Sequence, residues 1–142
     1  MGYELSSCTF NGSNMKRANL RGAMLDLATL KEVDLGGADL SECSAKGAYF
    51  GKSNLERASL RKGKLKNATF TGARLSNAIL AECDLRESML DRAKLDRALL
   101  HGARLDHADL SYADLTRAEL RGASLVQAKL HGAKDALAIW GD

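Results

Sequence analysis

Residues 103–122 read ARLDH ADLSY ADLTR AELRG, four units of five residues in which Ala always precedes Leu by two positions. The same frame extends through most of the chain. Every fifth position from Leu5 to Leu130 is occupied by 21 Leu, three Phe, one Met and one Ala, without a charged residue. The 25 positions two residues earlier, from Cys8 to Ala128, hold 17 Ala, three Cys, three Ser, one Gly and one Val. A strict period of five is therefore the main feature of this sequence.

Neither common type of secondary structure fits this period. An α-helix turns about 100° per residue, so a step of five residues turns about 140° and would scatter the leucines around the helix. In a straight strand, side chains alternate between the two faces, so an odd period would send successive leucines to opposite sides. A chain that turns a corner in every unit keeps both the small residue and the Leu inside. Repeated turning in one direction produces a stack of coils, which is a solenoid.

Several units resemble the A(D/N)LXX signature of pentapeptide-repeat proteins, among them ADLSY, ADLTR, AELRG, ANLRG and ASLRK. The resemblance covers residues 3 to about 133. It implies an all-β fold, a right-handed quadrilateral β-helix with 20 residues per coil. The 26 units then give about six and a half coils over residues 1–134. In this register Phe10, Phe50 and Phe70 occupy one inward column, where we expect aromatic rings to stack along the axis.

Composition and charge argue against several classes of function. The chain has 142 residues and a formal net charge of +3, which is mild for a sequence-independent nucleic-acid binder and of the wrong sign for a DNA mimic. No apolar run approaches the roughly 20 residues of a membrane helix. The N-terminal MGYELSSCTF lacks the regions of a signal peptide. We therefore expect a cytoplasmic protein without membrane contact; the alternative is a secreted effector module, if the sequence is part of a longer chain.

No group of residues has the pattern of a catalytic or metal site. The cysteines all occupy small inward positions, where Cys substitutes for Ala, and none forms a CxxC motif. The sequence GGADL at Gly36–Gly37 is a corner and not a phosphate loop, because no helix follows it. The histidines lie outward on three different faces, so they do not converge: His101, His107 and His131. We predict no catalytic residue, no metal, no cofactor and no enzymatic activity.

One face of the predicted rod carries most of the positive charge. We name it the Leu35 face; its units are centred on positions 15, 35, 55, 75, 95 and 115. Seven cations and four carboxylates give this face a charge of +3. One of its corner columns holds four arginines, whose planar guanidinium groups suit carboxylate or phosphate: Arg17, Arg57, Arg97 and Arg117. The column is either a ladder for an anionic partner or a solvated corner whose arginines pair with neighbouring Asp and Glu.

The adjacent face carries exposed aliphatic residues. We name it the Leu40 face; its units are centred on positions 20, 40, 60, 80, 100 and 120. Its outward column contains Ile79 and Leu99, which would be neighbours on successive coils, with His101 beside them. These residues are candidates for a protein-binding patch. The alternative is that they are ordinary scattered apolar surface residues.

The repeat pattern breaks at Asp135, where Leu is expected. We assign residues 135–142 to a C-terminal tail whose Leu137, Ile139 and Trp140 either fold over the last coil as a cap or form an interface with a second chain.

The sequence therefore predicts a non-enzymatic scaffold or adaptor that binds another protein of unknown identity. By resemblance, it is a repeat module of a bacterial effector or secretion-associated protein. One alternative is a DNA mimic that inhibits or protects DNA gyrase, which the net charge of +3 disfavours. Another is weak nucleic-acid binding through the arginine column. We also consider a homodimer that forms through an end of the rod.

Overall fold

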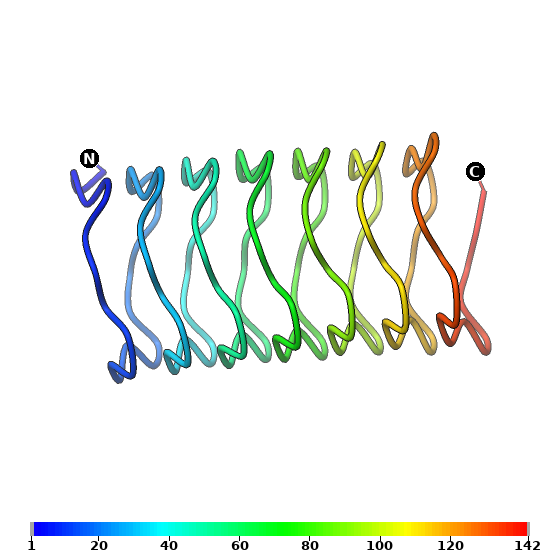
Figure 1. Cartoon of the computed structure of the whole chain (residues 1–142), viewed down its shortest axis with the longest axis horizontal. Helices are drawn as coiled ribbons and strands as arrows, with labels where there is room; N and C mark the ends of the chain where they lie inside the picture. Colours follow the sequence, from blue (N-terminus) through cyan, green and yellow to red (C-terminus); the bar gives the residue numbers. More distant parts are fainter. Residues whose placement is uncertain (1, 142) are drawn as a thin grey trace.

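The computed structural model describes residues 2–141, which form a single straight stack of coils with the two ends of the chain at opposite ends of the stack (Figure 1). Every fifth residue from Glu4 to Glu119 pairs in parallel with the residue 20 positions later. Each coil therefore contains 20 residues, as predicted. Across residues 2–141 the paired positions are isolated bridges, one per side of each coil, and no segment is helical. Accordingly, no helix in this part of the chain could cross a membrane.

Backbone hydrogen bonds join each coil to both of its neighbours. In the unit centred on Leu35, the Leu35 N–H donates to the Asn54 carbonyl at 2.7 Å, and the Asp34 N–H donates to the Ser13 carbonyl at 3.0 Å. A third bond, from the Ala38 N–H to the Leu35 carbonyl at 3.0 Å, closes the corner. The buried backbone is thus satisfied although each strand is a single paired residue long.

Every corner contains one residue in the left-handed backbone region. From Ser7 to Leu137, the residue two positions after each central residue has φ between 55° and 70°, and most of these residues are not glycine. This conformation costs a non-glycine residue on the order of 1 kcal/mol. The cost is offset because the same residue donates its N–H to the next coil, as Arg17 does to the Gly36 carbonyl at 2.9 Å.

The core consists of columns of inward side chains that run along the axis. The Leu and Ala columns are almost fully buried from Leu20 to Leu120. The rings of Phe50 and Phe70 are stacked, with centroids 4.9 Å apart and an interplanar angle of 2°, which confirms the predicted aromatic stacking for this pair. Phe10 shares the column but is only partly buried.

Polar residues in the inward positions bond to the backbone of their own corner or of the neighbouring coil. The Ser53 hydroxyl donates to the Phe50 carbonyl at 2.6 Å, and the Cys83 thiol donates to the Leu60 carbonyl at 2.8 Å. Within residues 2–141, no buried side-chain nitrogen or oxygen lacks a hydrogen-bond partner. The small inward position therefore accepts Ser or Cys in place of Ala without an unsatisfied polar atom.

The prediction that the coils end at residue 134 was wrong. Glu119 pairs with Ile139, and the Leu120 N–H donates to the Ile139 carbonyl at 2.7 Å, so residues 135–141 continue the stack and complete a seventh coil. The pairing uses backbone atoms and therefore survives the loss of Leu at position 135. Leu137 and Trp140 do not fold back as a lid; their side chains are 72% and 40% exposed.

Candidate partner-binding surfaces

Ile79 and Leu99 are neighbours on the Leu40 face, as predicted. They pair across successive coils, and both side chains are half-buried. Beside them the corner residues Ala81 and Gly102 have little or no side chain, which leaves a shallow, largely apolar hollow of about 420 Å³. His101 also lines this hollow. The structure thus brings the predicted apolar residues together into one concave patch.

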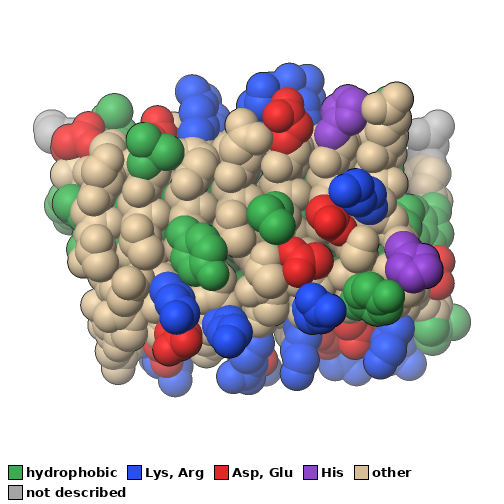
Figure 2. Space-filling view, in the orientation of Figure 1, with side chains coloured by type: hydrophobic (Ala, Val, Ile, Leu, Met, Phe, Trp, Pro, Cys, Tyr) green, Lys and Arg blue, Asp and Glu red, His purple; other side chains and the backbone are tan. Residues whose placement is uncertain are grey.

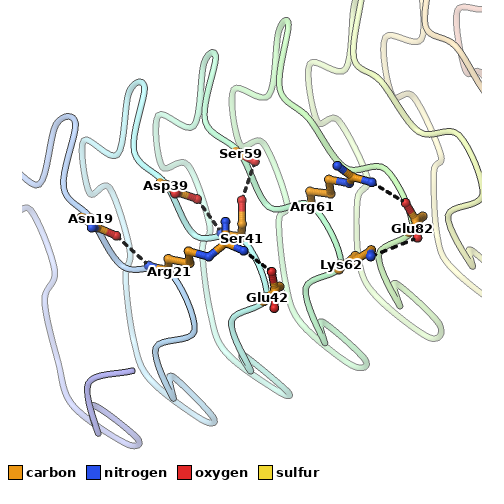
Figure 3. Close-up of polar contacts among 9 residues, drawn as sticks. All are labelled: Asn19, Arg21, Asp39, Ser41, Glu42, Ser59, Arg61, Lys62 and Glu82. Carbon is orange, nitrogen blue, oxygen red and sulfur yellow. Dashed lines mark hydrogen bonds and ion pairs between the residues drawn. The ribbon is translucent and has the colours of Figure 1, made fainter. Parts of the chain in front are cut away.

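Ion pairs occupy one edge of this patch. Arg61 bonds to Glu82 on the next coil at 3.0 Å, and Lys62 lies 3.9 Å from the same carboxylate (Figure 3). His101 Nδ1 lies 3.7 Å from a Glu119 carboxylate oxygen. The carboxylates on this edge are therefore already close to basic groups of the protein itself.

The Leu40 face is polar toward the N-terminal end, in contrast to the patch. Asp39 accepts a hydrogen bond from the Ser41 N–H at 2.9 Å, and the Ser41 and Ser59 hydroxyls lie 2.7 Å apart (Figure 3). Arg21 forms an ion pair with Glu42 on the next coil. The outward positions there form hydrogen bonds among themselves, so the apolar patch is a local departure on this face.

The arginine column borders the patch on its other edge. Arg97 lies two residues before Leu99, at the corner between the Leu35 and Leu40 faces. Among residues 2–141, no carboxylate lies within 4.0 Å of any arginine of this column. The exposed column consists of Arg17, Arg57, Arg97 and Arg117. The arginines of this column therefore form no close ion pair within the part of the chain that the structure describes.

In several ion pairs, a cation at the first corner position pairs with a carboxylate at the second corner position of the next coil, as Arg61 does with Glu82 and Lys66 with Glu87. The column arginines occupy the second corner position, and the coil that follows each of them has no carboxylate at that corner. Carboxylates elsewhere on the Leu35 face are engaged; Glu56, for example, pairs with Arg74.

Charged side chains gather along the long edges of the rod on the face shown in Figure 2, whereas hydrophobic side chains there are mostly separated from one another. The edges correspond to the corner residues, which point away from the core. The surface as a whole carries both signs of charge, in keeping with the net charge of +3.

The three cysteines are not paired with one another. Cys43 and Cys83 are buried, and burial raises the pKa of each thiol to about 12. Cys8 lies in the first coil and is exposed. Within residues 2–141, no group of three His, Cys, Asp or Glu side chains is arranged to hold a metal ion.

Sequence reasoning missed a second hollow, on the Leu35 face. Gly36 and Gly37 occupy both corner positions of one coil and leave a recess of about 420 Å³ between the corners on either side. Lys16, Arg17 and Arg57 line it. Two adjacent glycines within a column of arginines were the available signal, because glycine at both corner positions removes the side chains that would fill the space.

The family model described as "Pentapeptide repeats (8 copies)" matches residues 4–41, 34–72, 68–105 and 98–134. The chain belongs to the pentapeptide-repeat family. The right-handed quadrilateral β-helix expected from the resemblance is thereby confirmed, and the matching model describes a repeat and not an enzyme. No curated protein sequence matches this pentapeptide-repeat chain.

Several solved structures match most of this chain, and the pentapeptide-repeat protein HetL shares its fold. HetL, a protein involved in heterocyst differentiation regulation from the cyanobacterium Nostoc sp. strain PCC 7120, is 22% identical with a TM-score of 0.72; the match covers 96% of this chain and 86% of HetL. A trypsin-treated form of QnrB1, a plasmid-mediated fluoroquinolone resistance protein, is 19% identical with a TM-score of 0.46, covering 97% and 74%. Rfr23 from the cyanobacterium Cyanothece 51142 is 25% identical with a TM-score of 0.39, covering 96% and 90%.

Proposed function

We propose that this protein is a non-enzymatic scaffold that binds another protein through the apolar patch of the Leu40 face. The observation that carries the proposal is the pairing of Ile79 with Leu99 in one hollow, with Arg97 at the preceding corner, two residues before Leu99. Burying an aliphatic side chain of this size contributes about 1.5–3 kcal/mol, which suits an anchor residue of a partner. A regular rod presents such a patch on a rigid surface, so little ordering is required on binding.

The charges around the patch indicate the chemistry of the partner. Arg61 is already paired with Glu82, whereas Arg97 and its column neighbours Arg57 and Arg117 are free. A partner segment with an aliphatic or aromatic anchor, flanked on one side by Asp or Glu, would complement both features. Paired charges on one edge and free charges on the other would also fix the direction in which the segment lies.

The test is a selection from a randomised peptide library against the purified protein, followed by affinity measurement by fluorescence anisotropy. We expect enriched peptides to combine an apolar anchor with acidic residues, and Leu99→Asp to weaken their binding at least tenfold. Met89→Asp is the matched control, because Met89 is an exposed apolar residue at the equivalent position of a different face. Peptides without acidic or apolar enrichment, or equal losses in both variants, would refute the proposal.

The C-terminal end offers a second contact surface. Ile139 and Trp140 are about 40% exposed, and Leu130 and Leu137 of the same last coil are also exposed. Apolar side chains at the end of a solenoid favour association with another surface, and we propose a second copy of this chain. Light scattering should then give a dimeric mass for the wild type and a folded monomer for Trp140→Glu; a monomeric wild type would contradict the dimer.

The two alternative functions have less support. A DNA mimic requires a strongly acidic face, but the Leu35 face carries +3 and no face is strongly acidic. Nucleic-acid binding through the arginine column would lose affinity steeply with salt, and Arg57→Ala with Arg97→Ala would remove it. The expected cytoplasmic location and the role as a module of a bacterial effector remain part of the proposal.

A further inference from the structure

The recess at Gly36 and Gly37 is lined by more cations than carboxylates. Lys16 and Arg17 enter it from one coil and Arg57 from the coil on the other side, and none of the three has a carboxylate within 4.0 Å among residues 2–141. Three cationic side chains thus line one recess, and like charges that are close together repel one another.

The shape of the recess follows from the two glycines. Side chains at these corners lean toward the next coil, so the Arg17 Cγ lies 3.6 Å from the position a Gly37 Cβ would take, and the Lys16 Cε lies 3.6 Å from that of Gly36. Both side chains therefore lie across the glycines. Arg57 follows in the same column, one coil beyond the glycines, and also lines the recess.

The acidic groups nearest the recess are engaged elsewhere. Glu56 also lines the recess, but its carboxylate is bonded to Arg74. Asp34 accepts hydrogen bonds from the Gly36 N–H and from Asn54 Nδ2, both at 3.0 Å. Both carboxylates at the recess thus already bind donors of the protein, whereas the three cations that line it have no carboxylate within 4.0 Å among residues 2–141.

We propose that this recess is a binding site for a phosphate group. A phosphate dianion carries more negative charge and more acceptor oxygens than one carboxylate, and guanidinium and ammonium groups are the cations that bind it in proteins. The site is separate from the apolar patch of the Leu40 face, and it does not depend on the function proposed for that patch. The group is either free inorganic phosphate or the phosphate of a phosphorylated side chain.

The experiment is an NMR titration of the amide resonances of Gly36 and Gly37 with inorganic phosphate at constant ionic strength. The wild type should show saturable shifts. Gly37→Glu places a carboxylate between the two arginines and should weaken binding at least tenfold; the same backbone conformation already holds Glu at Glu42 and Glu82, so this variant should fold. Arg117→Ala, which alters the same column far from the recess, is the matched control and should bind as the wild type does.

One more variant and one more ligand complete the test of the phosphate site. Arg17→Ala should also lose binding, and it leaves the glycines unchanged. A phosphoserine peptide that binds more tightly than inorganic phosphate would identify a phosphorylated partner, whereas equal or weaker binding would identify free phosphate; both results support the site. Shifts that do not saturate, that chloride reproduces, or that persist unchanged in Gly37→Glu would overturn the proposal.

Discussion

The stacked pair of Phe50 and Phe70 gives a direct test of the columnar core. Each ring is fully buried, and the two are 4.9 Å apart and parallel to within 2°. An aromatic pair of this kind contributes about 0.5–1.5 kcal/mol beyond the area that it buries. Because Leu occupies the equivalent position of most coils, Phe→Leu keeps a side chain that the column accepts and removes the ring contact.

A double-mutant cycle isolates this contribution. We expect the free energies of unfolding of Phe50→Leu, Phe70→Leu and the double variant to give a coupling energy of about 0.5–1.5 kcal/mol. Phe10 is the control, since Leu30 separates it from Phe50 in the column. The pair Phe10→Leu and Phe50→Leu should therefore be additive within about 0.5 kcal/mol.

The assay is urea unfolding followed by circular dichroism and by the fluorescence of the single tryptophan, Trp140. Because each coil contacts only its neighbours, agreement between the two probes must be established before a single free energy is used. A coupling energy for Phe50 and Phe70 no larger than that of the control pair would refute the columnar packing of the rings.

Two other predictions concern the thiols and the response to acid. Cys43 and Cys83 are buried with pKa values of about 12, so a maleimide at pH 7 should label Cys8 alone in the native protein and all three thiols in denaturant; labelling of a second native thiol would contradict the core. Arg86 bonds to Asp84 through two hydrogen bonds of 2.7 and 2.6 Å, which lowers the pKa of the Asp84 carboxyl below its ordinary value. The carboxylate therefore stabilises the fold above the unfolded pKa of about 3.9, and this contribution is lost as the pH falls through the lower folded pKa. The stability difference between the wild type and Asp84→Asn should accordingly be present at pH 6 and vanish in strong acid; a difference that persists unchanged in acid would contradict the pairing.

The architecture could be predicted well from the sequence because few backbone structures fit a period of five residues. The columns of Leu and Ala identify the inward positions. Four sides of five residues give a coil of 20 residues, which matches the spacing of Phe50 and Phe70. The end of the stack was harder to place. Asp135 interrupts the Leu column, but Ala133 and Ala138 remain in the small inward column, and that signal would have shown that the coil continues.

The candidate sites were only partly predictable. Ile79 and Leu99 could be placed side by side from the register alone. Whether the column arginines are paired could not be read from the charge total of a face, because pairing depends on which corner positions the two charges occupy. In Arg61 with Glu82 the cation precedes the carboxylate by 21 residues, and no carboxylate stands in that relation to Arg17 or Arg57.

The equivalence of all four sides has a consequence for how such a rod can change over evolutionary time. Each unit turns one corner, so a gain or loss of five residues would leave every inward column filled while moving all downstream outward residues to the neighbouring side. A gain or loss of 20 residues would restore every surface column and change only the length. The interior therefore tolerates any whole number of units, whereas a binding surface built across coils, such as Ile79 with Leu99, is inherited only through changes of a full turn. An insertion of a full turn thus changes only the length of the rod, whereas an insertion of a single unit also disrupts a binding surface that spans the coils on either side of it.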